Sequence, residues 1–213
     1  MLLVCWRAAY DLDHMSIELP ALNVPIERLR LRSKERLFSA GQRVQRVFFL
    51  KSGAVTLVRA PSRQGAETVI HTARAGEWIA ESSLFSDKYH CDARARSECE
   101  LLVAKRADVL EQLSADPGLC FEFAEMLAAQ LRKLRTMQEI LRTRGAEERF
   151  VRWLFANATG SPASVELSGT LTDLADTLAL SREALYRVVG KLRRSRLIST
   201  GKNRIVLSGR LVR

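Results

Sequence analysis

The chain has 213 residues, a formal net charge of +10 at pH 7 and 47% hydrophobic residues. This length allows one domain of roughly 115 residues beside a smaller second module, and no apolar run approaches the roughly 18 residues of a membrane span. The four cysteines lack C-x-x-C spacing and the three histidines lack H-x-H pairing, which disfavours a metal site, a disulfide framework and a metalloenzyme. We therefore expect a cytoplasmic protein that has reduced cysteines, is not an enzyme and has no membrane partner.

The first part of the chain is expected to be mostly β. Residues 1–17 are assigned to an N-terminal arm, because the opening is apolar but too short and badly flanked for a secretory signal. Residues 18–115 then hold short apolar segments between glycines, at 47–50, 54–58 (followed by a turn at Pro61–Gly65), 68–71 and 101–104. Such spacing predicts a small barrel or roll. His71, in the third segment, is interpreted as a strand residue rather than a ligand.

A long helix is predicted over residues 116–144, from Asp116-Pro117 to Arg144-Gly145. Its apolar residues recur at intervals of three and four, and so small a domain leaves part of this seam uncovered. The same helix of a second chain is the economical partner, which predicts a two-fold homodimer. The candidate dimerisation residues are Leu127, Leu131, Leu134, Gln138 and Leu141. The alternative is that the helix packs on its own β-roll.

Residues 145–213 are predicted to form a second domain. A helix at 146–157 comes first, and a polar loop at 158–164 follows it. Thr172 is expected to cap the next short helix, a break falls at 179–180, and Ser181 is expected to cap a helix over residues 181–193. Two short helices at a tight turn indicate a helix-turn-helix.

The second of these helices has the composition of a base-reading helix. Its apolar residues share one side, which leaves a polar side free; the apolar set is Leu185, Val188, Val189 and Leu192, and the polar set is Arg182, Glu183, Tyr186 and Arg187. Arg182 can donate to guanine O6 and N7, and Glu183 can accept from cytosine N4. Arg187 could read another base or pair with Glu183. The plainer interpretation is helix capping with solvated arginines.

Most of the excess positive charge lies in the same part of the chain. From Ser181 to Arg213 ten Lys and Arg face one acid, whereas residues 1–115 carry a net charge of +3. Segments 197–199 and 204–207, around the turn at 201–203, read as the strands of a wing. Lys202 and Arg204 are therefore expected to contact DNA phosphates, and Lys191 is also assigned to the DNA-binding surface. A scaffold protein with a basic surface would keep this charge but not the ordered Arg-Glu-Arg face.

The order of these parts resembles the Crp-Fnr family, the cyclic AMP receptor and fumarate-nitrate regulators, over nearly the whole chain. The run Ser181-Arg182-Glu183-Ala-Leu-Tyr-Arg187 is similar to the SRE-x-x-x-R recognition helix of the receptor branch, and Gly76 to Phe85 also look like that family. The resemblance implies an α+β fold: a cyclic-nucleotide-binding-like β-roll (a double-stranded β-helix), a long dimerisation helix and a C-terminal winged helix-turn-helix. It further implies a dimeric bacterial regulator that reads a TGTGA-like inverted repeat and works with RNA polymerase.

The effector site departs from the family's pattern. Cys91 and Asp92 stand where cyclic-nucleotide binders have the Arg-Ser or Arg-Thr pair for the phosphate, and a carboxylate there repels phosphate. Ala80 replaces a glycine, although Glu81 remains, and Leu134 and Arg135 align with the pair that touches adenine. An effector other than cyclic AMP is expected. The candidate pocket comprises Glu81, Ser82, Ser83, Cys91, Asp92, Leu134 and Arg135.

Other family effectors stay open, and no cofactor is assigned. Only Cys5 lies in the N-terminal region where an iron–sulfur branch needs several cysteines. A haem is a candidate at His90-Cys91, near Tyr89, although neighbours on a strand point to opposite faces. Cys91 with Cys99 would suit a redox thiol sensor. A small anion held by Arg135 with Arg94 or Arg96, or DNA binding with no effector, completes the set. A hinge at Arg144-Gly145 would carry the signal.

Overall fold

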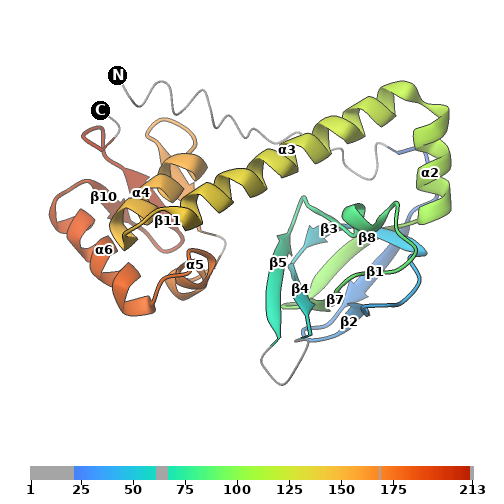
Figure 1. Ribbon diagram of the computed structural model, residues 1–213, viewed down its shortest axis with the longest axis horizontal. Helices are drawn as coiled ribbons and strands as arrows, with labels where there is room; N and C mark the ends of the chain where they lie inside the picture. Colours follow the sequence, from blue (N-terminus) through green and yellow to red (C-terminus); the bar gives the residue numbers. More distant parts are fainter. Residues whose placement is uncertain (1–21, 61–66, 168, 212–213) are drawn as a thin grey trace. The chain divides into compact units, whose positions relative to one another are not determined.

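The computed structural model describes residues 22–60, 67–167 and 169–211. The predicted arm (1–17) and the turn at Pro61–Gly65 lie outside these residues. The chain forms two compact units, divided between Leu127 and Ala128. That boundary falls inside the long helix α3 (Pro117–Arg142; Figure 1) rather than at either of its ends. No helix in the described part is both long and apolar enough to cross a membrane.

The N-terminal unit is built on two antiparallel four-stranded sheets, which is the roll that the sequence predicts. The strands are β1 (Glu27–Leu31), β2 (Arg36–Phe38), β3 (Arg46–Ser52), β4 (Ala54–Arg59), β5 (Thr68–Arg74), β6 (Trp78–Ile79), β7 (Asp92–Ala95) and β8 (Cys99–Lys105). One sheet has the order β1-β8-β3-β6 and the other β2-β7-β4-β5. The four predicted apolar segments are confirmed as β3, β4, β5 and β8. The remaining strands are short and mixed in polarity, so their patterns gave no signal.

The core of the roll is made by alternate residues of the strands. Along β7, Ala93 and Ala95 are buried while Asp92 and Arg94 are half-buried on the opposite face. Inside, the rings of Phe38 and Tyr89 stack 3.9 Å apart, centroid to centroid. Ala93 and Ala95 belong to the same buried cluster as this ring pair.

A second apolar cluster covers the outer face of the β3–β8 pair. It joins strand residues such as Phe49 and Leu102 to Val109 of α2 (Arg106–Ala115) and to Phe123 and Met126 at the start of α3. Helix α2 was not predicted, because it is only ten residues long and no side chain caps its start at Lys105. The first turns of α3 thus belong to the roll, and Leu127 is half-buried against the same cluster.

The C-terminal unit is a helical bundle with a small sheet. Its elements are the end of α3, α4 (Ala146–Asn157), β9 (Ser164–Glu166), α5 (Leu171–Thr177), α6 (Arg182–Arg194), β10 (Ile198–Thr200) and β11 (Arg204–Leu207). The sheet order is β10-β11-β9, so the predicted two-stranded wing gains a third strand. The predicted helix at 146–157 and both wing strands are confirmed. Ile140 of α3 is 2% exposed and packs in the same core as Phe150 and Leu185.

The predicted dimerisation residues lie along α3 with unequal exposure. Leu134 is 68% exposed, Leu131 47% and Leu141 38%, and Gln138 is also exposed. These four residues recur every three or four positions, which places them along one side of the helix. Leu131, Leu134 and Leu141 therefore form an apolar stripe on α3 that the described residues leave exposed.

Candidate nucleic-acid interface

The helix-turn-helix begins with a reciprocal cap at α5. Thr170 is the N-cap: its hydroxyl accepts from the Asp173 backbone N–H at 3.2 Å, and the Asp173 carboxylate accepts from the Thr170 N–H at 2.8 Å. The expectation that Thr172 caps this helix is therefore wrong. The reason is that Thr170 has the acid three residues later that a capping box requires, whereas Thr172 is followed at that spacing by Ala175.

The turn between the two helices is sharp. Helix α5 ends at Thr177, and Ala179 adopts a left-handed conformation with φ of 49°. A non-glycine residue in this region costs about 1–2 kcal/mol. The Leu180 N–H bonds back to the Ala175 carbonyl at 2.9 Å, which reverses the chain direction just before Ser181. The predicted break at 179–180 is therefore confirmed.

Helix α6 divides into a buried and an exposed face as predicted. Ser181 caps it by accepting from the Ala184 N–H at 3.1 Å. The buried residues are the four predicted ones, Leu185, Val188, Val189 and Leu192. Arg182, Glu183 and Arg187 are exposed, and Tyr186 is 52% exposed. Burial of the apolar side against Phe150 and Leu178 fixes which side of α6 meets solvent.

The exposed face of α6 is charged and available for contacts. No hydrogen bond or ion pair among the described residues engages the guanidinium of Arg182 or Arg187. The Glu183 backbone N–H, the Ser181 hydroxyl and the two arginine charges lower the pKa of the Glu183 carboxyl. Glu183 is therefore ionised at neutral pH, as an acceptor for a cytosine amino group must be.

Of the two phosphate contacts predicted in the wing, Lys202 is exposed to solvent and Arg204 already has partners within the protein. Lys202 lies in the exposed turn between β10 and β11. The Arg204 guanidinium instead donates to the Ser164 hydroxyl at 2.7 Å and pairs with Glu166 at 3.1 Å. β9 brings those two partners beside β11 by strand pairing. Sequence reasoning missed β9, because three residues carry too little periodicity.

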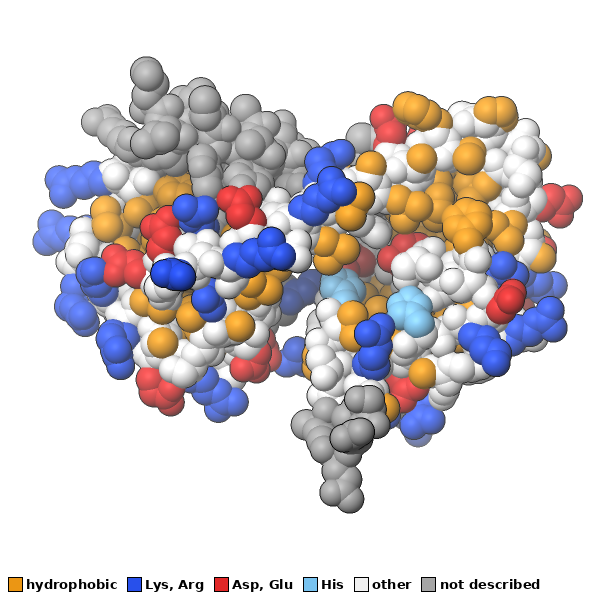
Figure 2. All heavy atoms as spheres, in the orientation of Figure 1, with side chains coloured by type: hydrophobic (Ala, Val, Ile, Leu, Met, Phe, Trp, Pro, Cys, Tyr) orange, Lys and Arg blue, Asp and Glu red, His pale blue; other side chains and the backbone are white. Residues whose placement is uncertain are grey.

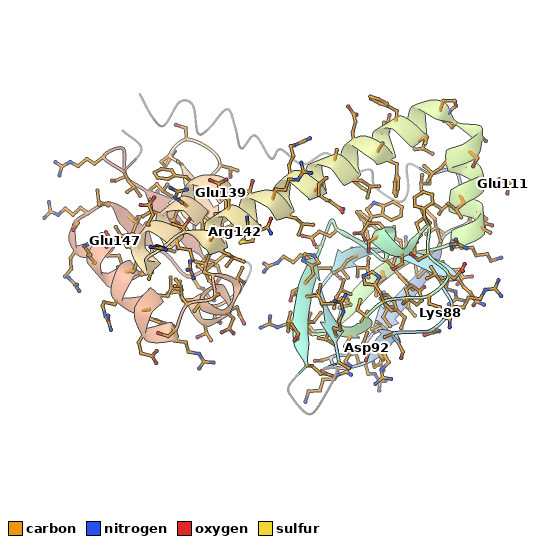
Figure 3. All side chains as sticks on the ribbon, in the orientation of Figure 1. Lys88, Asp92, Glu111, Glu139, Arg142 and Glu147 are labelled. Carbon is orange, nitrogen blue, oxygen red and sulfur yellow. The ribbon has the colours of Figure 1, made fainter. Side chains whose placement is uncertain are left out.

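Lys191 also has a partner within its unit. Its ammonium lies 2.6 Å from a carboxylate oxygen of Glu147, at the start of α4 (Figure 3). Both side chains are largely exposed, so this pair adds little to stability and can open toward a phosphate. Arg204 and Lys191 can therefore meet DNA only by exchanging or sharing these partners.

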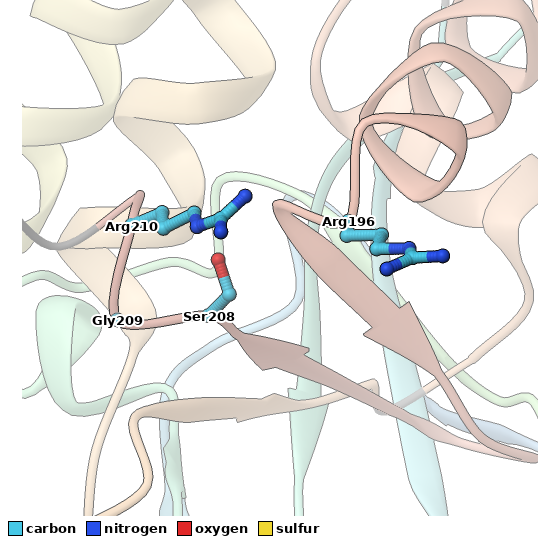
Figure 4. Close-up of a pocket in the computed structure, with 4 residues that line it drawn as sticks. All are labelled: Arg196, Ser208, Gly209 and Arg210. Atoms are coloured by element: carbon cyan, nitrogen blue, oxygen red, sulfur yellow. The ribbon is translucent and has the colours of Figure 1, made fainter.

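Two further arginines, not singled out from the sequence, extend the positive surface. Arg196 and Arg210 line a hollow of about 400 Å³ with Ser208 and Gly209. Figure 4 shows the Arg210 side chain above the Ser208 hydroxyl and Arg196 across the gap. The Ser208 oxygen is buried and has no partner within the described residues. Basic side chains are thus spread over much of this unit (Figure 2), beyond the α6 face.

In the roll, Cys91 and Asp92 do not point the same way. Cys91 is buried among the core residues, whereas the Asp92 carboxylate accepts from the Ala40 N–H at 2.8 Å and from Arg94 at 3.2 Å. Arg94 in turn makes a two-pronged bond to Glu67, at 2.8 and 2.9 Å. Asp92 (Figure 3) is therefore held by two donors, and these hydrogen bonds and charges lower the pKa of its carboxyl.

The other predicted pocket residues of the roll, Glu81, Ser82 and Ser83, form the short 3-10 helix η2 (Glu81–Ser83). Ser83 is buried and bonds to the exposed His90 ring at 3.2 Å, while Ser82 is exposed. Burial raises the pKa of the Glu81 carboxyl. Burial likewise raises the pKa of the Cys91 thiol, which favours its unreactive protonated form. Leu134 and Arg135 belong to the other compact unit.

Fold and site together define a class of protein. A β-roll, a long helix and a winged helix-turn-helix with an exposed Arg-Glu-Arg face are typical of a DNA-binding regulator. A family model for the cyclic nucleotide-binding domain matches residues 28–116, and one for the Crp-like helix-turn-helix domain matches residues 148–210. The chain belongs to the Crp-Fnr family of transcription regulators, which are not enzymes.

Similar proteins cover most of the chain. The anaerobic regulatory protein of Bacillus subtilis (strain 168) is 25% identical over 210 residues, which is 94% of this chain and 88% of that protein. The cAMP-activated global transcriptional regulator Vfr of Pseudomonas aeruginosa is 25% identical over 194 residues, 86% and 90% respectively. Among solved structures, FixK2 from Bradyrhizobium japonicum has a TM-score of 0.70 at 20% identity, with 88% of this chain and 96% of that chain covered. The structural likeness supports the fold alone.

Proposed function

We propose that this regulator is a homodimer that inserts α6 into the major groove and reads a TGTGA-like half-site in an inverted repeat. The observation that carries the proposal is the exposed row Arg182, Glu183 and Arg187 on the first two turns of a helix whose opposite side is buried. Arg182 donates to a guanine, and the ionised Glu183 accepts from a cytosine on the facing strand.

Backbone contacts supply the sequence-independent part of the affinity. Lys202 in the wing turn is exposed and reaches the phosphates that flank the groove. Ser181 and Tyr186 border the reading residues on α6. The Tyr186 hydroxyl is a donor for phosphate oxygens, and the Ser181 hydroxyl becomes one when its hydrogen leaves Glu183. Lys191 and Arg204 also contact phosphates, while each keeps part of its interaction with Glu147 or Glu166. Each neutralised phosphate adds about 0.9 to the slope of log affinity against log salt.

Dimerisation is supported by the apolar stripe of α3. Leu131, Leu134 and Leu141 are all more than a third exposed, and Leu127, half-buried, continues the same seven-residue spacing. Leucines at such spacing pair with the same residues of a second helix. The dimer places two α6 helices on one duplex, which is why the site is an inverted repeat.

The effector is proposed to be something other than cyclic AMP. Asp92 carries a negative charge at the position where the family's nucleotide binders place a hydroxyl for the phosphate, and its donors Ala40 and Arg94 are already engaged. A cyclic phosphate brought there meets a carboxylate. A DNA target and an RNA polymerase partner both imply that the protein works in the cytoplasm.

Fluorescence anisotropy on labelled duplexes tests the DNA-reading proposal. The effector-free protein is titrated onto TGTGA-N6-TCACA and onto a scrambled duplex of equal composition. We expect preference for the inverted repeat, and Arg182→Ala should lose roughly 1–3 kcal/mol on that duplex and little on the scrambled one. Equal losses on both duplexes would show that Arg182 binds phosphate and does not read bases.

Light scattering tests the dimer separately. Leu131→Lys places a charge in the middle of the proposed seam, so the molecular mass should fall toward that of one chain. Lys133→Ala, an exposed change on the same turn of α3, is the control. A Leu131→Lys protein that keeps the mass of two chains would place the interface elsewhere.

A further inference from the structure

A single arginine of α4 joins the backbone carbonyls of two segments that are far apart in the sequence. The Arg149 Nε and Nη2 atoms donate to the Thr143 carbonyl at 3.2 and 3.0 Å. Its Nη1 atom donates to the carbonyls of Leu178 and Ala179 at 2.9 and 3.1 Å. All four residues belong to the C-terminal unit. The planar guanidinium therefore bridges two backbone segments at once, which no other side chain can do with this fork geometry.

The two segments are the ends of the helices that matter for DNA reading. Thr143 is the residue after α3, and its N–H still bonds to the Ile140 carbonyl. Leu178 is the C-cap of α5, and Ala179 follows it in the turn. Carbonyls at helix C-termini carry partial negative charge, so a cation there is favoured on both sides. Arg149 also holds the left-handed Ala179, a conformation that side-chain-bearing residues avoid.

The turn in question determines where the reading residues lie. Ala179 is followed at once by Leu180 and the α6 cap Ser181, and Arg182 is the first residue of α6. A bidentate contact between Arg182 and a guanine tolerates displacements of only about 0.5 Å. We propose that Arg149 is a positioning residue that couples the end of α3 to the turn and thereby sets the position of α6. This inference rests on the proposed function.

Other links between the helices of this unit are of a different kind. Lys191–Glu147 and Arg152–Glu139 each join two side chains, at 2.6 and 3.4 Å, and these side chains are between 32% and 60% exposed. Such pairs are screened by solvent and tolerate movement of the backbone that carries them. Arg149 instead bonds directly to backbone atoms of both segments, so it restrains the movement of one segment relative to the other.

The test compares Arg149→Lys with Arg152→Lys, a matched change one turn later on α4. Lysine keeps the positive charge but cannot reach Thr143 and Ala179 together. At 25 °C, with circular dichroism showing both variants folded, Arg149→Lys should bind the inverted repeat about tenfold more weakly and scrambled DNA within about twofold of the parent protein. A residue that merely stabilises the fold would leave both affinities of the folded protein unchanged, and this result would overturn the proposal.

Hydrogen exchange gives a readout that needs no DNA. In Arg149→Lys the amides of residues 178–180, which bond within the turn, should exchange faster than in the parent and Arg152→Lys proteins. Unchanged exchange there overturns the coupling, whatever the DNA result. A parent protein that does not discriminate between the duplexes refutes the proposed function, while the exchange measurement still decides the role of Arg149.

Discussion

Ser181 lets the stability of α6 be separated from its affinity for DNA. Its hydroxyl accepts from the Ala184 N–H, so Ser181→Ala leaves that donor without its cap. Loss of an N-cap costs about 1 kcal/mol, and for a domain of 60–100 residues this lowers the melting temperature by about 4–8 °C. Ser181→Asp restores the cap, because aspartate is an equally good N-cap, and should melt within about 2 °C of the parent.

DNA binding should distinguish the same two variants in the opposite way: Ser181→Asp should change the salt dependence of the affinity, and Ser181→Ala should not. Ser181→Asp adds a negative charge beside Arg182, so the slope of log affinity against log salt should flatten by about 0.9. Ser181→Ala should keep that slope. Calorimetry and anisotropy over a salt series measure both quantities, with Ser199→Ala, an exposed change on β10, as control. If Ser181→Asp melts as early as Ser181→Ala, the hydrogen bond to Ala184 does not stabilise α6 and the reasoning fails.

Two more predictions concern the wing and the roll. Lys202→Ala should flatten the slope of log affinity against log salt by about 0.9. Arg204→Ala should flatten this slope less and should also lower the melting temperature, because Ser164 and Glu166 hold Arg204 in the fold. Equal effects of the two variants on slope and melting temperature would contradict these separate roles. Burial raises the pKa of Glu81, so the folded state holds that proton more tightly than the unfolded chain, and stability should decline as the pH rises from 4.5 toward the raised value. Glu81→Gln removes this decline, so its free energy of unfolding in urea should rise relative to that of the parent protein only at the higher pH. A difference between the two proteins that does not change with pH would refute the prediction.

Several elements could be predicted because their signals are local. The alternation of apolar segments in β3, β4, β5 and β8, the periodicity of α3 and α4, and the two-sided pattern of α6 each follow from side chains a few residues apart. Ser181 was identified as a cap for the same reason. Thr172 was mistaken for one because its type fits, while the acid that completes the cap lies three residues after Thr170.

The sequence by itself determined the class of this protein: a β-roll, a long helix and a helix-turn-helix whose second helix has exposed and buried residues set by a spacing of three and four. Tertiary structure decided which of its charges are free. Arg182 and Arg204 are both exposed arginines of the same basic segment, yet β9 brings Glu166 to Arg204, whereas no ion pair among the described residues engages Arg182. It also brought Arg149 to Thr143 and Leu178 at once. Contacts between residues tens of positions apart depend on how the elements pack, and periodicity within one element carries no record of them.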